Sequence, residues 1–382
     1  MRVNLIGDAP SRTGNTERNT MTKTLWVGII GANAERGWAR ESHVPAVQGL
    51  NGLELAAVAN KGQKAADAAA RAFGVEKAYG NVADLFRDPD IDLVTVAVTL
   101  PAHRELILDS LAAGKHIYCE YPLGLGTAES QELAAAAQKG SVHTAIGLQT
   151  RGSPAARRAR ELIASGAIGR PLTARVYSPT LGFGPKTNPA EAYTEKPENG
   201  VTVVTIQGAH TLDLVVALLG GFADVAALTS RQYPEIRIGD GAPQARTTFD
   251  HLLVQGRLAS GATASVEVAG GRPAGTPFQL EVVGEAGVLL LDGGAPRGFQ
   301  SGRLRLSLNG EPQAVDEAET ASMPDSAANV AAIYAALRDD IAQGTHTVPD
   351  FRYAVRMARL IEDVAASSQS GQRRPATDWP MA

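Results

Sequence analysis

The chain has 382 residues, 44% hydrophobic and 20% charged, so it can bury a large core and is too apolar for a disordered protein. At about 100–200 residues per domain, this length predicts two or three domains. The 36 Lys and Arg residues against 40 Asp and Glu give a net charge of −4, which argues against a nucleic-acid binder, and the single cysteine, Cys119, excludes a disulfide framework or a multi-cysteine metal site.

The amino-terminal residues and the apolar segments bear on localisation. Residues 1–20 contain charged side chains and no apolar segment of signal-peptide length, and the chain has no unbroken apolar run of about 18 residues. We therefore expect a cytoplasmic protein without a membrane-spanning helix. Residues 1–22 are predicted to be a disordered polar tail, because the first strand-like run starts only at Leu25.

Short apolar runs alternate with helical stretches over residues 25–148. Strands that are buried on both faces read as unbroken apolar runs, and their alternation with helices is typical of βαβ units with a parallel sheet. Gly74 and Gly114 follow two of the helices and mark their expected ends. The predicted strands are Leu25–Ile30, Leu53–Ala59, Ile91–Val98, His116–Cys119 and Thr144–Leu148, and the predicted helices are Ala39–Leu50, Gln63–Phe73, Asn81–Phe86, Ala102–Ala113 and Ala128–Lys139.

Strand-like runs separated by Gly-rich turns dominate the second half, as in an antiparallel sheet. Residues 179–200 are rich in Pro, Gly and Asn and predict a long loop. The predicted fold is therefore α/β: a Rossmann doubly wound parallel sheet over 23–148, then an α+β domain with an open, mostly antiparallel sheet over 149–382. The predicted helices of the second half are Pro154–Ala164, Val201–Leu219, Ala327–Gln343 and Phe351–Ser367, and its strands are Leu172–Tyr177, Ala226–Gln232, Thr247–Leu258, Ala262–Val268, Phe278–Gly284, Val288–Asp292 and Arg303–Leu308.

The turn after the first strand matches part of a dinucleotide-binding fingerprint. Gly31 takes the place of the glycine that makes the tight turn. Asn33 stands where a second glycine usually lets the backbone approach the pyrophosphate, and Asn tolerates positive φ well. Gly37 comes one residue late for the third, helix-packing glycine. Arg36 and Trp38 lie in the same loop, so all five residues are predicted to bind a cofactor.

The end of the second strand bears on which nucleotide binds. An NAD site usually places Asp or Glu there for the ribose 2′-hydroxyl, but this strand ends in Asn60 and Lys61. A lysine attracts a 2′-phosphate, so both residues are predicted to bind NADP, with NAD as the alternative. Ligands of open α/β sheets bind at the carboxyl ends of the strands. The further cofactor-binding candidates at these ends are Thr99, Leu100, His103, Glu120, Tyr121 and Gln149.

Two motifs resemble the Gfo/Idh/MocA (glucose–fructose oxidoreductase/inositol dehydrogenase) family. That family carries Glu-Lys-Pro after the fourth strand, where this chain has Glu120-Tyr121-Pro122. It also carries Asp-x-x-x-His-x-x-Asp on the first long helix of the second domain, where this chain has Ile206, His210 and Asp213. Tyr121 thus replaces the lysine of the first motif, and Ile206 replaces the first aspartate of the second motif. The two-domain layout of the family matches nearly all of 25–367.

Several separate segments look closest to one subgroup of the family. It is the subgroup resembling the fungal galactose-regulon repressor, a member that binds NAD(P) but regulates transcription and also lacks the motif lysine. The segments that carry this likeness are Gly31–Trp38, Ser42–Ala46, Leu148–Pro154, Asn199–Val201 and Gly208–Asp213.

The family resemblance implies hydride transfer, and that chemistry sets roles for particular residues. Oxidising a hydroxyl requires a base within hydrogen-bond reach of its proton. His210 is predicted to be that acid/base, since the unperturbed pKa of histidine lies near neutral pH. Tyr121 is predicted to orient the hydroxyl in place of the lysine, and Asp213 to orient His210 or a substrate hydroxyl. Arg151 and Tyr193 are the further substrate-binding candidates, alongside His210 itself.

We therefore expect an NAD(P)-dependent oxidoreductase acting on a CH–OH group of a sugar, polyol or related polyhydroxyl compound. Two alternatives stay open: a non-catalytic NAD(P)-binding regulatory protein, and a lyase or hydrolase that recycles its NAD. The resemblance also implies a homodimer or homotetramer formed through the open sheet. The seven histidines have no metal-site spacing, so no metal is expected.

Overall fold

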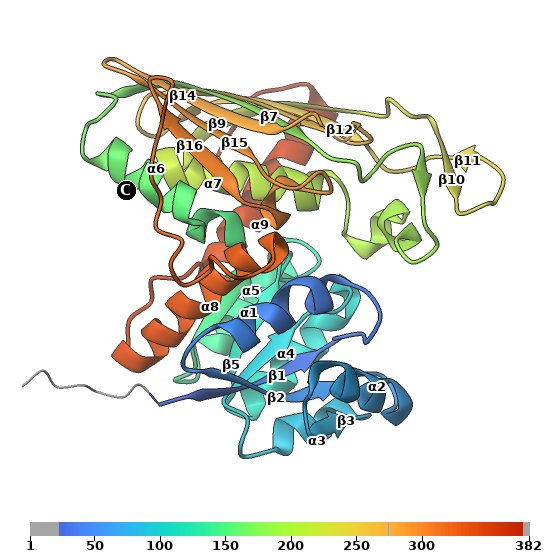
Figure 1. The fold of residues 1–382 in the computed structure, drawn as a ribbon. Helices are drawn as coiled ribbons and strands as arrows, with labels where there is room; N and C mark the ends of the chain where they lie inside the picture. The colour runs from blue at the N-terminus through green and yellow to red at the C-terminus, as the bar shows by residue number, and fades with distance from the viewer. Residues whose placement is uncertain (1–22, 274, 377–382) are drawn as a thin grey trace, which may run out of the picture.

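Two sheets, one in each half of the chain, organise the computed structural model, which describes residues 23–376 except residue 274 (Figure 1). The predicted polar tail, residues 1–22, lies outside the described residues. The first half forms a six-stranded sheet and the second half a nine-stranded sheet. The predicted class is confirmed: α/β, with a Rossmann-like parallel sheet followed by a mostly antiparallel one.

The N-terminal sheet has the strand order β3-β2-β1-β4-β5-β6, and every pair of strands is parallel. The order reverses between β1 and β4, which is where such sheets bind dinucleotides. The short strand β3 is absent from the sequence prediction because its three residues are only half-buried and form no apolar run. The strands are β1 Leu25–Ile30, β2 Leu53–Ala59, β3 Lys77–Tyr79, β4 Leu93–Val96, β5 His116–Glu120 and β6 Thr144–Gly147.

Local signals account for the ends of the helices around this sheet. Gly74 caps α2 in the left-handed conformation, with φ of 70°. The Asn81 side chain accepts a hydrogen bond from the Ala83 amide and begins α3. A π-helical turn, Ala39–His43, leads directly into α1 and holds His43 fully buried. The helices are α1 Val44–Gly49, α2 Gln63–Phe73, α3 Val82–Arg87, α4 His103–Ala112 and α5 Thr127–Ala137.

The second sheet is open and has the order β17-β16-β15-β14-β7-β13-β12-β9-β18. Strands β7 and β13 pair in parallel, and the other neighbours pair antiparallel. The strands are β7 Pro171–Pro179, β9 Phe222–Ser230, β12 His251–Leu258, β13 Thr263–Ala269, β14 Phe278–Gly284, β15 Val288–Gly293, β16 Leu304–Leu308, β17 Glu311–Pro312 and β18 Arg374–Pro375.

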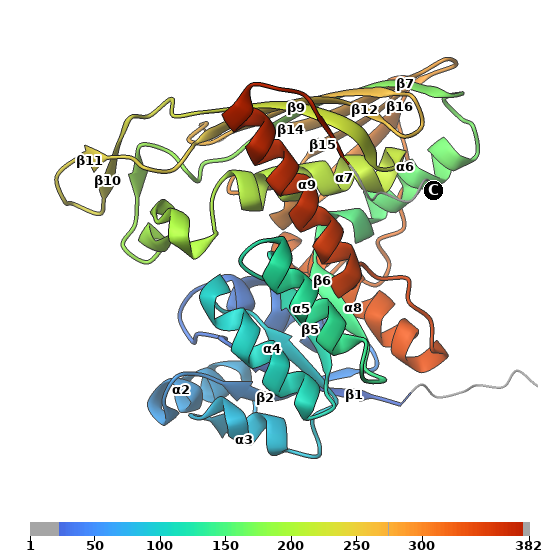
Figure 2. The ribbon, with the colours of Figure 1, turned by 180° about the vertical axis from the view of Figure 1, so that it is seen from behind.

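Three helices, α6 (Pro154–Ala164), α7 (Ala209–Leu219) and α9 (Phe351–Ser370), cover one face of this sheet and lie between it and the N-terminal domain (Figures 1 and 2). The helical stretch Pro197–Leu219 is apolar and long enough to cross a membrane by composition, with a mean hydropathy of 1.5. However, 78% of its most apolar window is buried inside the molecule. It therefore packs as the core helix of a folded domain.

The other face of the large sheet carries a mixture of apolar and charged side chains. Leu228 and Leu253 pair across β9 and β12 and are 55% and 38% exposed. The neighbouring strands carry cross-strand ion pairs between Arg175 and Glu281 and between Arg305 and Asp292. This face is thus more polar than an obligate interface core. The homo-oligomer stays a prediction.

Helix α8 (Asp325–Gln343) returns to the N-terminal domain and completes its core. Its Tyr334 and Val330 belong to one buried cluster with Val27 of β1 and Tyr118 of β5. The N-terminal sheet is therefore covered on one side by a segment some 180 residues later in the chain. The predicted boundary at 148/149 stays a prediction, since the packing unit around this sheet extends beyond it.

The predicted long loop over 179–200 is part of a small arm. Its strand β8 (Lys186–Thr187) pairs with β10 (Glu235–Ile238), which also pairs with β11 (Gln244–Ala245). A buried ion pair fixes the base of this arm: the Arg246 Nε and Nη2 atoms lie 3.0 and 2.6 Å from the two Glu195 carboxylate oxygens. The segment is therefore anchored on both sides rather than a free loop.

Candidate cofactor and substrate site

The loop after β1 forms the first wall of the predicted cofactor site. Gly31 has φ of 93°, and a Cβ atom there would lie 2.5 Å from the Ala97 carbonyl oxygen, so this position requires glycine. Asn33 accepts hydrogen bonds at its side-chain oxygen from the Glu35 and Arg36 amides, 2.9 and 3.2 Å away. This turn brings exposed backbone to the edge of the sheet where a pyrophosphate would bind.

Two details of the glycine pattern differ from the sequence interpretation. Asn33 is absent from the described non-glycine residues with positive φ, so it serves as a side-chain acceptor that shapes the turn rather than as a glycine substitute. Gly37 has φ of 101°, but a Cβ atom there would meet no atom within 4 Å. The positive φ accounts for the glycine here, and Gly37 does not fill the helix-packing role for which it comes one residue late.

The end of β2 is tied to the same turn. The Asn60 side-chain amide donates to the Ala32 carbonyl over 2.9 Å, and the Asn60 main-chain amide donates to Tyr79 of β3. Lys61 follows directly and is exposed. Lys61 thus lies just after the end of β2, where proteins of this fold bind the ribose 2′ substituent.

Lys61→Asp should weaken NADPH binding by about tenfold or more while changing NADH binding much less, because the change reverses the charge beside the 2′-phosphate. Fluorescence titration with both nucleotides measures this difference. Lys64→Asp, at an exposed lysine three residues further on in α2, is the matched control. An equal loss for NADPH and NADH would refute the 2′-phosphate role of Lys61.

A buried chain of hydrogen bonds holds Glu120 at the end of β5. The His43 Nε2 atom lies 2.9 Å from a Glu120 carboxylate oxygen, and His43 Nδ1 lies 2.9 Å from the Tyr334 hydroxyl. That hydroxyl is in turn 2.6 Å from the Thr95 hydroxyl in β4. All four groups are satisfied when His43 donates to Glu120 and accepts from Tyr334. Sequence reasoning noted His43 within a family-like segment but gave it no role.

Tyr121 and His210 meet where the two domains face each other. Their ring centroids are 6.2 Å apart, and the rings are nearly perpendicular. Both side chains are buried, with 7% and 5% exposure. Burial raises the pKa of Tyr121, with a further contribution from the Asp213 carboxylate, so its phenol stays protonated. The structure brings together these two predicted catalytic residues.

Burial lowers the pKa of His210 to about 4, against the opposing effect of the Glu120 carboxylate. The pKa of His210 therefore lies below the unperturbed value on which its acid/base assignment was based, since a buried imidazole loses the hydration of its charged form. Within the described part of the chain, the Nδ1 atom of His210 has no hydrogen-bond partner. His210 is thus a neutral imidazole whose Nδ1 atom is enclosed and without a partner among the described residues.

Asp213 has partners other than His210. The Tyr353 hydroxyl donates to Asp213 over 2.6 Å, and a guanidinium nitrogen of Arg151 lies 3.5 Å from the same oxygen. Arg151 also stacks over the Tyr353 ring, 4.1 Å from its centroid. Burial raises the pKa of Asp213 despite the opposing Arg151 charge. The predicted orientation of His210 by Asp213 stays a prediction, because the contacts of this carboxylate point to α9 and Arg151.

The remaining predicted residues fall into two groups. Gln149 is buried with an unpartnered side-chain oxygen, and the indole nitrogen of Trp38 is also buried and unpartnered among the described residues. His103 instead lies 3.0 Å from the Pro122 carbonyl and 3.1 Å from the Val98 carbonyl, so its ring braces two loops and presents no free nitrogen to a cofactor. Leu100 is buried beside it; Thr99 and Arg36 are at least partly exposed, and Tyr193 lies in the arm at 37% exposure.

The comparisons with known proteins agree with this geometry. Residues 25–148 match the model "Oxidoreductase family, NAD-binding Rossmann fold", and residues 154–293 match the model "Gal80p, C-terminal domain". The chain is 30% identical over 286 residues to the dehydrogenase aclE of Aspergillus oryzae, covering 72% of this chain and 78% of that protein. The chain belongs to the Gfo/Idh/MocA oxidoreductase family, near its Gal80-like subgroup.

Regulators and enzymes both occur among its relatives. The GAL80 regulatory protein of Saccharomyces cerevisiae is 27% identical over 68% of this chain and 67% of its own length. A solved super-repressor mutant of Gal80p from that yeast has a TM-score of 0.83 at 24% identity, over 92% of this chain and 98% of its own. A solved structure of levoglucosan dehydrogenase with NADH and L-sorbose has a TM-score of 0.78 at 22% identity. The match covers 93% of this chain and 100% of the dehydrogenase chain.

Proposed function

We propose that this protein is an NAD(P)-dependent oxidoreductase that acts on a CH–OH group of a sugar or polyol. The observation that carries the proposal is the meeting of Tyr121 and His210, whose ring centroids are 6.2 Å apart, at the end of β5. Unpaired buried polar atoms are costly in a folded protein, and three of the ten such atoms in the described residues belong to His210, Gln149 and Trp38. They lie on the loops after β1 and β6 and on α7.

The residues at the strand ends fit a nicotinamide dinucleotide. Gly31 permits a close approach of backbone, and the Asn33 turn presents amides at the edge of the sheet. A bound nicotinamide accepts or supplies the hydride. Glu120, held by His43, fixes the carboxyl end of β5 beside Tyr121.

The side chains of this site would handle the proton of the reacting hydroxyl. Oxidation removes a hydride from the carbon and a proton from the oxygen, so a base must accept the proton. His210 is neutral at pH 7, and its imidazole would accept this proton. Tyr121, which stays protonated, would donate a hydrogen bond to the same substrate oxygen, although it lacks the positive charge of the family lysine.

A second candidate function is that of a non-catalytic NAD(P)-binding regulator. It is favoured by the match of residues 154–293 to the Gal80p C-terminal domain and by Tyr121 at the lysine position. Such a protein would bind nucleotide at the same strand ends without turning over a substrate. The His210 site distinguishes the two proposals, because only an enzyme requires a base there.

Fluorescence titration with NADPH and NADH measures nucleotide binding, and separate reactions of NADP+ or NAD+ with a panel of sugars and polyols test the proposal. We expect binding of nucleotide and a substrate-dependent change in absorbance at 340 nm, the ordinary signature of the reduced nicotinamide. Binding without turnover on any panel member would favour the regulatory function. Nucleotide that co-purifies and is regenerated without net turnover would instead indicate a cofactor-recycling lyase or hydrolase.

A further inference from the structure

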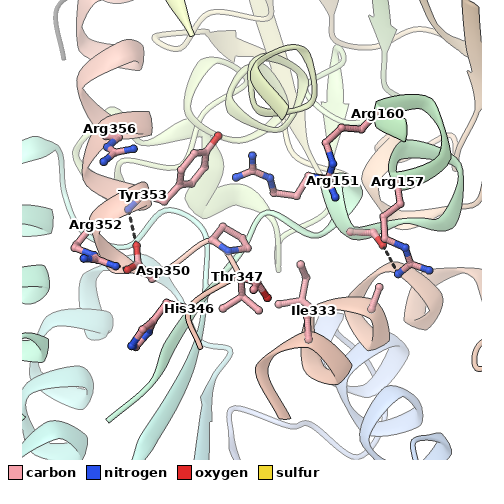
Figure 3. A pocket seen from close by; sticks show the side chains of 15 residues that line it. Arg151, Arg157, Arg160, Ile333, His346, Thr347, Asp350, Arg352, Tyr353 and Arg356 are labelled. Atoms are coloured by element: carbon pink, nitrogen blue, oxygen red, sulfur yellow. Dashed lines mark hydrogen bonds and ion pairs between the residues drawn. The ribbon is translucent and has the colours of Figure 1, made fainter. Parts of the chain in front are cut away.

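A cavity of about 550 Å³ lies behind the nucleotide-binding edge, between α6, α8 and α9 (Figure 3). Its lining residues Arg151 and Gly152 lie in the turn after β6 that also holds the cofactor candidate Gln149, whereas no lining residue comes from the loops after β1, β2, β4 or β5. Its volume is in the range of small-molecule pockets. Its walls combine apolar side chains of α8 with a ring of arginines: Arg151, Arg157, Arg160, Arg352 and Arg356.

The cavity is lined by more arginines than acidic side chains that could pair with them. Among the described residues that line it, Asp350 is the one acidic side chain, and it pairs with Arg352 over 2.6 Å. Arg151 pairs with Asp213 behind the wall. For Arg160 and Arg356, no ion pair to a carboxylate occurs within residues 23–376 as described.

Arg160 lies beside two other arginines in the wall of the cavity. Burial lowers its pKa first, and the charges of Arg151 and Arg157 lower it further. Figure 3 shows the Arg151 guanidinium directed toward Tyr353, with the Arg160 side chain next to it; both residues line the cavity. Like charges held together in a half-buried cavity are stabilised when an anion enters between them.

We propose that this arginine cavity binds a small molecule carrying a phosphate group. A phosphate presents three oxygens and close to two negative charges at neutral pH, and guanidinium groups pair with it in bidentate fashion. Arg160 and Arg151 on one side and Arg356 on the other surround the space from α6, the preceding turn and α9. Ile333, Val348 and Tyr353 supply an apolar wall for the carbon skeleton.

This assignment also changes the interpretation of Arg151. Sequence reasoning placed it at the substrate, and the structure places it between this cavity and the buried Asp213. Asp213 lies on α7 one turn after His210. One guanidinium group therefore connects the proposed anion site with the helix that carries the proposed base.

Isothermal titration calorimetry at constant ionic strength tests the site on the full chain. The ligands are inorganic phosphate, glucose 6-phosphate, glucose and citrate. We expect both phosphate compounds to bind in a way that depends on the cavity arginines, whereas any binding of glucose, a candidate substrate, should not change when these arginines are replaced. Arg160→Gln and Arg356→Gln should each weaken binding by about tenfold or more, since each removes a charge-assisted contact.

Arg158→Gln is the matched control, because Arg158 lies on α6 beside Arg157 but pairs with Glu161 outside the cavity. It should bind phosphate as the unchanged chain does, and thermal melts should show all three variants folded. Absence of phosphate binding, binding of citrate alone, or an equal loss in Arg158→Gln would overturn the proposal. Phosphate binding that disappears with saturating NADPH would also overturn it, because the phosphate would then occupy the cofactor site.

Discussion

Replacing His210 by alanine should lower kcat for alcohol oxidation by about 10²–10⁴-fold, the usual contribution of a general base. The Kd of NADPH should stay close to that of the unchanged protein, because the imidazole lies on α7 of the second domain while the nucleotide-binding loops belong to the first. Steady-state kinetics and nucleotide titration measure the two quantities separately. Full activity in His210→Ala would remove the acid/base assignment.

His116→Gln is a suitable control for this experiment. Burial lowers the pKa of His116 to about 4 as well, but the residue begins β5 while Glu120 ends it, so it lies at the opposite edge of the sheet. Loss of activity in both variants would indicate a general effect of removing a buried imidazole. Tyr121→Phe removes only the hydroxyl and should reduce kcat while preserving the ring packing against His210.

The same assignment predicts the pH dependence of the enzyme. A base acts in its deprotonated form, and the pKa of His210 in the free protein is lowered to about 4. The value of kcat/KM for oxidation should therefore be flat from about pH 6 upward and fall as pH drops through about 4. A falling limb centred near the ordinary pKa of histidine, about 6.5, would show that His210 is more hydrated than its burial implies.

The N-terminal domain could be predicted well from the sequence because its strands are buried on both faces. A buried parallel strand must be an unbroken apolar run, so β1 and β2 were predicted with their observed bounds. Strand β3 lacks this signal, since its residues are half-buried. The small arm was missed for the same reason: β8, β10 and β11 are short and largely exposed, so they form no apolar pattern.

The sequence placed Tyr121 and His210 in one candidate site, but it did not predict the electrostatics around them. The motifs identified Tyr121 and His210, and the structure places their rings together. The lowered pKa of His210 arises from burial between two domains, which no local pattern reveals. The bond from His43 to Glu120 joins residues 77 positions apart, and only the fold brings them within 2.9 Å. A family-like segment around His43 was the available signal.

Replacing Arg246 by methionine should lower the free energy of unfolding by about 3–5 kcal/mol, because it leaves buried carboxylates without their cation. Arg246 is fully buried and bonds both oxygens of Glu195, while another nitrogen lies 3.2 Å from Asp250. Chemical denaturation measures the loss. Arg175→Met is the matched control: its cross-strand partner Glu281 is partly exposed, so we expect about 1 kcal/mol or less.

The effect of Arg246→Met should also be local to the arm. Glu195 belongs to the segment that carries Tyr193, and it accepts a further hydrogen bond from Thr248 over 2.7 Å. Losing the arginine frees this segment from β12, so limited proteolysis should cut near residues 185–200 faster than in Arg175→Met.

If Arg246→Met does not fold, Glu195→Gln keeps the side-chain size and removes one charge, and it should show the same proteolysis pattern with a smaller loss of stability. Equal stability and equal proteolysis in the Arg246 and Arg175 variants would contradict the anchoring role, since a solvent-screened pair and a buried one would then contribute alike.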